Sequence, residues 1–595
     1  MLSTLRAIGN RVFKRSSIQL LWRVARTQGL AGIWLRAGIL VRQGFAYGHW
    51  VRTHDQLSAA DRRAIALHLR ALAYQPLLSV LLPTFDTPEK WLRKAIDSVR
   101  QQCYTNWELC IADDASTTPH VARVLKEYAQ LDPRIRILLR PDNGHISAST
   151  NSAMAMARGE FVALLDHDDE LAPHALYLVV ANLNANPRYD LLYSDEDKMD
   201  AQGRRFDPYF KPAWNAALLE SQNLVSHLGV YRTELLRGLG GFRSGVEGCQ
   251  DWDLALRCSE RIAPQNICHI PFVLYHWRAV DGSTAVHHGH KDYVKRAAQR
   301  VVQEHMERLQ ESACVVPSVG SFVHPVLALP MPTPSVSVLV WGSSAPAVPV
   351  PDCTLWPALE VLPCTPLHSE SLAQSINRVV RQAQGELLCL LRSDLQVDDA
   401  QWLQELVRQA CRAGVGSVGP MHLDAHGNIR HAAIVLCARA DAAMPFHSPY
   451  QGLDSAITGV AGRAALTQHV SALAPGCLVL RAATWRQVHG LDAGQFPQTH
   501  FELDLCLRLA QSGYNNVWTP QAKVRSQVDP KSYRTAADAD EASRFRSRWQ
   551  QVLQSDPSHS PNMTLDSIWP GPAFPPRKEI PWLPYLTQEP ARDLP

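Results

Sequence analysis

Residues 77–170 alternate between short apolar runs and amphipathic stretches, and this alternation constrains the fold more than any other feature of the sequence. The apolar runs have the length of buried strands, and the stretches between them carry apolar residues at helical spacing. Strands that alternate with helices predict a parallel α/β sheet, because parallel strands need a long crossover connection. The predicted strands are 77–82, 108–112, 135–139 and 162–165, and the predicted helices are 91–101, 120–131 and 149–157.

Three of the predicted strands end in polar residues. The first runs through Pro83 to Thr84 and Asp86, the second ends at Asp113-Asp114, and the fourth ends at Asp166-His167-Asp168-Asp169. In an open α/β sheet, ligands bind in the crevice at the carboxyl ends of the strands. The sequence therefore predicts a ligand site at this edge.

Asp166, Asp168, Asp169 and Glu170 place four acids within five positions. Carboxylates this close repel one another unless a cation lies between them. Carboxylate oxygens are the ligands that Mg²⁺ and Mn²⁺ prefer, often together with substrate phosphates. The alternative is a solvated acidic turn that caps a helix from Pro173 onward. The residues alone leave both interpretations open.

The composition is that of an ordinary globular protein of two or more domains, with 595 residues, 46% hydrophobic and 19% charged. A net charge of +3 gives no general basis for nucleic-acid binding. The 13 cysteines form no C-x-x-C pair and no Cys/His cluster at zinc spacing. This pattern favours a reducing compartment over a disulfide framework or a structural zinc site.

Residues 1–54 are basic, with no acid before Asp55, and Trp and Leu lie between the Arg and Lys residues. No charge-free apolar run there approaches the ~20 residues that span a bilayer. We expect a helical basic extension over 1–75 that contacts an anionic membrane surface through residues 1–52. The alternative is a basic helix packed on the protein itself. The expected location is cytoplasmic, peripheral on the inner face of the cell membrane.

The second half of the chain repeats the first. Ala157-Arg158-Gly159-Glu160 corresponds to Ala383-Gln384-Gly385-Glu386, and Asp253–Arg257 corresponds to Asp504–Arg508. Agreement at separate places indicates two copies of one fold. The predicted domains are 1–75 (basic extension), 76–312 (first copy), 313–334 (Pro-rich linker), 335–554 (second copy) and 555–595 (Pro-rich, extended tail).

Residues 76–310 resemble a GT-A glycosyltransferase of family 2, of the bacterial surface-polysaccharide and O-antigen kind. The resemblance lies in seven stretches in family order: Ser79–Asp86, Trp107–Ser116, Asn143–Asn151, Phe161–Glu170, Tyr193–Lys198, Gly248–Arg257 and Leu274–Arg278. It implies a Rossmann-like nucleotide-diphospho-sugar transferase fold for each of two tandem domains.

The resemblance also implies roles for single residues. The residues implied on the donor nucleotide, a UDP- or dTDP-sugar, are Pro83, Thr84, Asp86, Asp113, Asp114, Asn151 and Asp166. Asp168 and His276 are the implied ligands of Mn²⁺ or Mg²⁺, which would act as a Lewis acid on the departing diphosphate.

On the acceptor side, Asp251 is implied as the general base, although Gln250 stands where many relatives carry an acid. Trp252 is expected to stack on the acceptor sugar, with core packing as the alternative. Asp253 is expected to pair with Arg257 one helical turn away.

The second copy retains little of this chemistry. Alignment of the strands places Arg392 at the position of Asp166, Asp394 at that of Asp168, and Glu502 near that of Asp251. We expect a degenerate domain with an acceptor-holding or architectural role. A second, metal-independent activity in which Arg392 neutralises a diphosphate stays open.

The predicted function is an inverting, nonprocessive, metal-dependent transfer of a sugar to a lipid-linked or polysaccharide acceptor. One base without a nucleophilic partner indicates inversion, and the chain lacks the Q-x-x-R-W motif of processive relatives. The alternatives are a catalytically silent scaffold of a polysaccharide-assembly complex and a sugar nucleotidyltransferase, which should carry a Gly-rich basic loop after its first strand.

Overall fold

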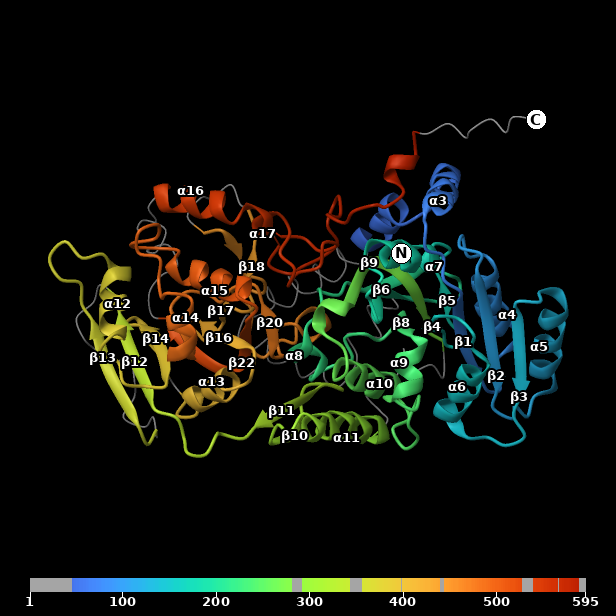
Figure 1. Ribbon diagram of the computed structural model, residues 1–595, viewed down its shortest axis with the longest axis horizontal. Helices are drawn as coiled ribbons and strands as arrows, with labels where there is room; N and C mark the ends of the chain where they lie inside the picture. The colour runs from blue at the N-terminus through green and yellow to red at the C-terminus, as the bar shows by residue number, and fades with distance from the viewer. Residues whose placement is uncertain are drawn as a thin grey trace.

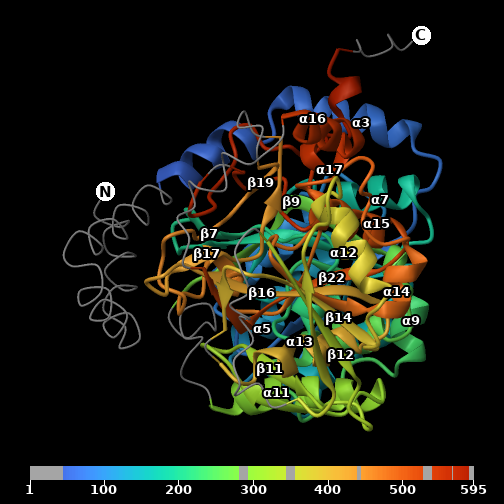
Figure 2. The same ribbon diagram turned by 90° about the vertical axis from the view of Figure 1, so that its left-hand side faces the viewer.

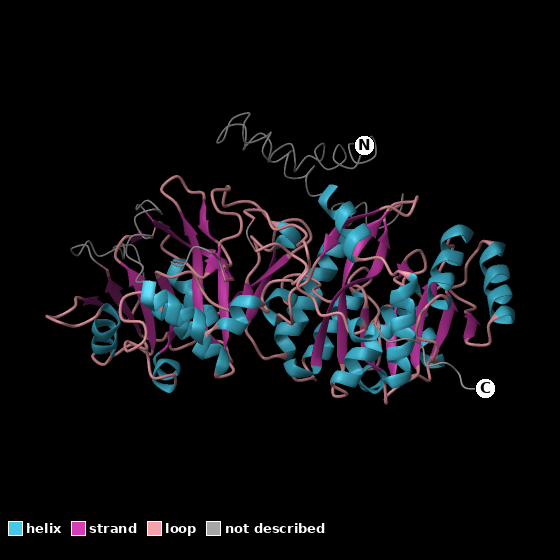
Figure 3. Cartoon of the chain, turned by 90° about the horizontal axis from the view of Figure 1, so that it is seen from above, coloured by secondary structure: helices cyan, strands magenta, loops and turns pink. Residues whose placement is uncertain are grey.

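The computed structural model describes residues 45–280, 292–342, 356–397, 399–438, 444–526, 539–565 and 567–587. They form two α/β domains side by side along the long axis of the molecule (Figure 1). Seen from above, each domain contains a sheet flanked by helices (Figure 3). The fold is thus mixed α/β with two sheets, as predicted.

The first sheet has the strand order β3-β2-β1-β4-β8-β6-β9-β5, with β7 paired to β6. β1 to β4 are mutually parallel, and β8 runs antiparallel to β4. This confirms the parallel sheet predicted from the alternation. The strands are β1 (Leu78–Thr84), β2 (Trp107–Asp113), β3 (Ile135–Leu139), β4 (Phe161–Leu164), β5 (Glu170–Leu171), β6 (Leu191–Met199), β7 (Arg205–Tyr209), β8 (Gly229–Arg232) and β9 (Ile267–Arg278).

Helices cover both faces of this sheet. Leu78, Val80 and Leu82 of β1 belong to one core cluster with the helices on one face, whereas Leu81 belongs to a cluster on the other face. Alternate side chains of the strand thus pack into two hydrophobic cores, one on each face of the sheet. The helices are α4 (Glu89–Arg100), α5 (Pro119–Leu131), α6 (His145–Met156), α7 (Ala175–Ala185), α8 (Ala216–Leu219), α9 (Thr233–Gly238), α10 (Gln250–Ser259) and α11 (Asp292–Arg308).

The second sheet repeats this topology. Its order is β13-β12-β14-β21-β16-β22-β15, with β17 on β16 and β20 on β22. Among the described residues it has no counterpart of β3. The strands are β12 (Val336–Trp341), β13 (Leu359–Cys364), β14 (Leu387–Arg392), β15 (Leu395–Gln396), β16 (Val415–Leu423), β17 (Ile429–His431), β20 (Gln468–Val470), β21 (Cys477–Arg481) and β22 (Asn515–Ser526). The short strands β18 (Val435–Leu436) and β19 (Phe446–His447) pair separately.

Six α-helices complete the described part of the second domain. They are α12 (Leu372–Val380), α13 (Trp402–Ala410), α14 (Ala482–Gln487), α15 (Phe501–Gln511), α16 (Ala539–Arg548) and α17 (Gln550–Gln554). Figure 2 views the molecule from the side of this domain, with α12 and α14 toward the viewer and α11 of the first domain at the bottom.

Side-chain contacts repeat as well as strands. The Ser79 hydroxyl donates to Glu108 (2.7 Å) and accepts from the Gly159 N–H (2.9 Å). The Ser337 hydroxyl accepts from the Gly385 N–H at 2.8 Å and donates to Glu360. A Cβ at Gly159 or Gly385 would collide with these serines, which explains the glycine in both copies.

The segment predicted as a linker is structured. Residues 313–327 form a hairpin of β10 (Ala313–Pro317) and β11 (Val323–Leu327) that packs on α11. Val315, Val323 and Leu327 are buried in the core of the first domain. The prolines misled the prediction, because Pro317 and Pro325 fit this isolated two-stranded pairing.

The predicted extended tail lies against both domains over its described part. The Asp556 carboxylate accepts from the Leu436 N–H (2.7 Å) in the second domain. The Asn562 amide donates to Asp195 (2.8 Å) in the first. Farther along, the Trp582 indole donates to Asp61 (2.8 Å). Figure 1 shows this red segment crossing from the second domain to the first.

The described part of the basic extension is helical, over residues 45–54 and α3 (Ala59–Ala71). Ser58 caps α3 through a reciprocal pair of hydrogen bonds with Asp61. Residues 1–44, which carry most of the predicted membrane contact, lie outside the described residues. Within the described part, no helix has the length and apolarity needed to cross a bilayer.

Candidate active site

The carboxylates predicted at the donor edge order the loops that follow β1 and β2. Asp86 accepts from the backbone N–H groups of Thr118 (3.0 Å) and Thr117 (2.8 Å), which lowers its pKa. Its backbone has a positive φ of 45°. Asp86 thereby fixes the start of α5 beside the end of β1.

Asp113 and Asp114 are both buried at the end of β2. Asp113 accepts from the Ser116 N–H (3.1 Å), and Asp114 accepts from the Gly144 N–H (3.0 Å) and pairs with Arg140 (2.8 Å). Pro83 and Thr84 are buried in β1, directly opposite Ala112 and Asp113. The strands therefore bring the predicted nucleotide-binding group together, and its contact with a nucleotide stays a prediction.

Asn151 corrects one prediction. Its amide nitrogen donates to the Phe242 carbonyl and its amide oxygen accepts from the Phe242 N–H, both at 2.8 Å. Asn377 makes the same two bonds with Leu491 in the second domain, at 2.9 and 3.0 Å. The side chain is engaged at both ends within the fold in both domains, which supports a structural role.

The acidic cluster follows β4. One ligand atom from each of Asp166, Asp169 and His227 lies within 4.8 Å of the others, an arrangement that could hold a metal ion. Burial raises the pKa of both carboxyl groups, and the nearby charge of Asp168 raises it further. Asp169 is fixed by the Tyr275 hydroxyl (2.6 Å) and the Arg278 N–H (2.7 Å). The Asp168 side chain is 23% exposed and therefore accessible to a ligand.

His276 does not join this cluster. Its Nδ1 lies 2.7 Å from Asp197, and it lines a pocket of about 300 Å³ with residues of the extension such as Asp55. Its neighbour Tyr275 instead contacts Asp169 and stacks on His227, with ring centroids 4.4 Å apart. Successive side chains of β9 point to opposite faces, so the predicted metal ligand His276 is wrong.

His227 is the residue that sequence reasoning missed. It stands in an irregular segment, Ser221–Leu228, with no motif around it. Its N–H donates to Glu196 (2.8 Å), an acid of the Tyr193–Lys198 stretch. No local sequence pattern predicts that His227 lies near Asp166, because its position depends on stacking against Tyr275, which is distant in the sequence.

Asp251 lies in the first turn of α10 and is partly exposed. The Asn223 amide donates to its Oδ2 at 2.6 Å. The charge of Asp251 contributes to the raised pKa of Asp166, behind burial and the charge of Asp168. Asn223 also accepts from the Ser226 N–H, so it joins the Asp251 carboxylate to the segment that carries His227.

Trp252 corrects another prediction. It is 5% exposed, belongs to the core of the first domain, and its indole N–H donates to the Leu219 carbonyl at 2.8 Å. A ring buried in this way offers no face to an acceptor sugar. Core packing, the alternative interpretation, is correct.

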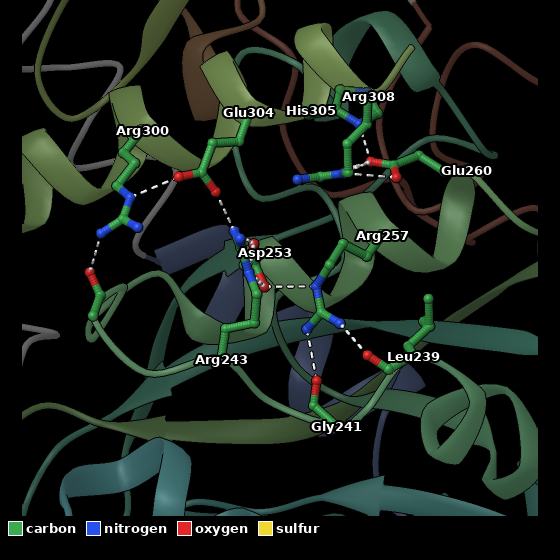
Figure 4. A network of polar contacts seen from close by, with 11 residues as sticks. Leu239, Gly241, Arg243, Asp253, Arg257, Glu260, Arg300, Glu304, His305 and Arg308 are labelled. Carbon is green, nitrogen blue, oxygen red and sulfur yellow. Dashed lines mark hydrogen bonds and ion pairs between the residues drawn. The ribbon is translucent and has the colours of Figure 1, made fainter.

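A network of ion pairs holds α10 in place (Figure 4). As predicted, Arg257 pairs with Asp253 (2.8 Å), and it also donates to the Gly241 carbonyl (2.7 Å). Arg243 bridges Asp253 to Glu304 of α11. Arg508 and Asp504 form the matching pair at 2.7 Å in the second domain. In the first domain the network anchors the helix that presents Asp251.

The corresponding position in the second domain is closed. Arg392 pairs with Asp394 at 2.5 Å, and Asp394 accepts from the Ser526 hydroxyl at 3.0 Å. Glu502 is 3% exposed, accepts from the Gly476 N–H (3.0 Å), and burial raises its pKa to about 7. Arg392 is thus neutralised by a neighbour within the fold.

Comparison with known proteins agrees with this geometry. Residues 79–240 match the sequence profile of glycosyl transferase family 2, and this range contains β1, β2, β4 and the acidic cluster. The candidate glycosyltransferase EpsE of Bacillus subtilis (strain 168) is 30% identical over 189 residues, which are 31% of this chain and 67% of EpsE. The chain belongs to glycosyltransferase family 2.

Two longer relatives are similar to most of the chain. An uncharacterized protein, y4gI, of Sinorhizobium fredii is 36% identical over 553 residues, 85% of this chain and 60% of y4gI. The O-antigen biosynthesis protein RfbC of Myxococcus xanthus is 35% identical over 529 residues, 83% of this chain and 41% of RfbC. The chain thus spans about half the length of these two relatives, and both alignments are long enough to include residues of both domains.

Proposed function

We propose that this family 2 chain is an inverting, nonprocessive, metal-dependent glycosyltransferase of surface-polysaccharide or O-antigen assembly. The observation that carries the proposal is the cluster of Asp166, Asp169 and His227 at ligand spacing, with Asp251 bound to Asn223 of the segment that carries His227. A nucleotide-sugar donor, with UDP- or dTDP-sugars favoured, and a lipid-linked or polysaccharide acceptor are the proposed substrates. The name of the relative RfbC supports this context.

The proposed mechanism is a single displacement in which Asp251 takes the proton of the attacking acceptor hydroxyl. Asn223 donates to Oδ2 of Asp251, which leaves Oδ1 to receive that proton. The ion pairs of α10 hold the carboxylate in its orientation. Proton removal by a positioned base contributes about 10²–10⁴-fold to a rate.

The acidic cluster fits Mn²⁺ or Mg²⁺, since it combines the buried carboxyl group of Asp169 with the partly buried Asp166 carboxyl group and His227 imidazole at ligand spacing. Asp166 and His227 would hold the ion together with the exposed carboxylate of Asp168, whereas Asp169 would support them from within the fold. When bound, the ion would act as a Lewis acid toward the leaving diphosphate. Tyr275 orients the ring of His227.

The assignment of His227, in place of His276, as a metal ligand is testable. We expect His227→Ala to weaken Mn²⁺ binding by more than about tenfold, the size of effect that loss of even a ligand's supporting bond produces. His276→Ala should leave Mn²⁺ affinity unchanged, because its partner Asp197 lies on the other face of the sheet. Calorimetric titration of both variants with Mn²⁺ makes the comparison. Equal weakening in the two would contradict the assignment of His227.

The proposed role of the second domain is non-catalytic, because Arg392 and Asp394 are engaged with each other and Glu502 is enclosed. The proposed location is the inner face of the cell membrane, with residues 1–52 on the lipid surface. Most of those residues lie outside the described part of the chain.

The experiment that tests the function is nucleotide release from UDP-, dTDP- and GDP-sugars, with Mn²⁺ and with chelator. We expect one donor to be hydrolysed or transferred in a metal-dependent way. Donor binding by calorimetry separates an enzyme that requires its acceptor from an inactive protein. Absence of both turnover and donor binding would favour the silent scaffold instead.

A further inference from the structure

One irregular segment of the first domain, residues 210–228, lies against the second domain. It joins β7 to β8 and contains one short helix, α8. Figure 1 shows α8 beside β20 of the second domain, and the two elements are in contact. We call residues 210–228 the junction segment. It carries Asn223, which donates to Asp251, and His227, which lies beside Asp166.

The active-site end of the junction segment is held by a buried lysine. Lys211 is fully buried, and its ammonium donates to Glu196 (3.1 Å) and to the carbonyls of Val225 (2.7 Å) and His227 (2.6 Å). Its own N–H donates to Asp195 at 2.8 Å. The beginning and the end of the segment are therefore tied together beneath the site.

The middle of the junction segment is held by the second domain. The Asn215 amide donates to the His469 carbonyl (2.9 Å) of β20 and accepts from the His469 N–H (3.0 Å). Arg412, two residues after α13, binds Glu220 with both terminal nitrogens at 2.8 and 2.7 Å. It also pairs with Glu311 at 2.9 Å.

These contacts are buried and specific. Asn215 is 2% exposed and Glu220 is 6% exposed, and both nitrogens of the guanidinium match both oxygens of the carboxylate. Such bidentate, charge-assisted pairs fix direction as well as distance. Removal of one partner of a buried pair leaves an uncompensated charge, so the pair resists opening.

The junction segment cannot hold its own conformation. α8 has only four residues, far below the length at which a helix is stable alone. The order of the segment therefore comes from tertiary contacts: four of its apolar side chains pack in the core of the first domain, Lys211 ties its two ends together, and the second domain holds Asn215 and Glu220. Asn223 is only three residues from Glu220, so a movement at Glu220 reaches the partner of Asp251 directly.

We infer that the second domain positions the active site of the first, through Arg412 on Glu220 and the His469 backbone on Asn215. This inference rests on the proposed transferase function. Arg412 and Glu220 are positioning residues that act through Asn223 and His227 and touch no substrate. The degenerate copy then has a defined task, which is to keep the junction segment in its catalytic conformation.

The experiment uses the full-length chain and the Arg412→Gln variant. We expect hydrogen exchange of residues 216–228 to rise at least about tenfold, because local opening is controlled by the contacts of that segment. We expect kcat to fall about 10- to 100-fold, since displacements near 1 Å cost this much, with the donor KM changed less than about twofold. Mn²⁺ affinity should fall as well, through His227.

Two further variants distinguish a positioning role of Arg412 from general destabilisation of the second domain. Arg378→Gln breaks a more exposed ion pair within the second domain, with Glu370 at 3.0 Å, and should alter none of these readouts. Glu220→Gln combined with Arg412→Gln removes the uncompensated charge and should recover part of kcat, with the unfolding temperature near that of the wild type.

Unchanged exchange in residues 216–228, or equal effects of Arg378→Gln, would overturn the inference. Raised exchange with unaltered kcat and Mn²⁺ affinity would also overturn it, and would leave Arg412 as an interface contact alone. If the wild-type chain transfers no sugar, the proposed function fails separately. Exchange and Mn²⁺ affinity then still decide whether Arg412 positions the metal-binding end of the segment.

Discussion

Asp251→Asn should reduce sugar transfer by about 10²–10⁴-fold, the contribution expected of a positioned general base. The asparagine retains an oxygen that can accept from Asn223, so α10 and its ion pairs should remain in place. The substitution removes only the ability to take a proton. Donor affinity by calorimetry should stay near that of the wild type, and the loss should appear in kcat.

The repeat of the fold supplies a matched control. Glu502→Gln changes the residue at the corresponding place in the second domain, where burial raises the carboxyl pKa to about 7. This substitution should leave transfer unchanged, because the second domain is proposed to be non-catalytic. A large loss of donor affinity in Asp251→Asn would argue against the base and for a binding role.

Asp168→Asn should abolish metal-dependent donor turnover while the fold persists. Stabilisation of the leaving diphosphate by a Lewis acid contributes several kcal/mol, and ~4 kcal/mol corresponds to about 10³-fold in rate. Asp168 is the exposed carboxylate of the cluster, so its replacement disturbs no buried pair. Nucleotide release measured across a Mn²⁺ titration, wild type beside variant, gives the comparison.

Asp394→Asn is the corresponding control for the metal site. Asp394 aligns with Asp168 but pairs with Arg392, so its replacement should alter the stability of the second domain and not the response to Mn²⁺. Undiminished transfer by a folded Asp168→Asn variant would remove Asp168 from the proposed metal site. An equal loss of transfer in both variants would indicate instead that destabilising either domain inactivates the whole chain.

The framework of the first domain could be predicted from the sequence because its buried strands are short, apolar and ended by polar residues. Asp113, Asp114 and Asp166 meet at one sheet edge for that reason, since the carboxyl ends of parallel strands share an edge. The pairing of Asp253 with Arg257 followed equally from the helical period. Each of these predictions rested on a local sequence pattern, and the tertiary contacts agree with it.

The errors concern the direction of side chains and the partners of distant segments. His276 and Tyr275 are neighbours in β9, and only the register of the strand decides which one faces Asp166. Trp252 follows the partly exposed Asp251 yet points into the core. Asn151 has a partner 91 residues away, which no local pattern predicts.

Proline-rich composition did not reveal how two segments pack. The hairpin of β10 and β11 and the described part of the tail both pack on the first domain despite their prolines. Proline removes a backbone donor, but it does not prevent burial of the residues around it. Asn562, fully buried on Asp195, is an example within such a stretch.

The position of Asn562 and Lys578 has a consequence for synthesis of the chain. Domains fold in order as the ribosome releases them. Asp195 and Asp55 belong to the first part released, but Asn562 and Lys578, which satisfy their carboxylates, come several hundred residues later. Asp195 then has His269 and the Lys211 N–H as partners, and Asp55 has Arg205, but both acids lack their last partner while the second domain is being translated. We therefore expect the C-terminal segment to pack last, on a first domain that has already formed.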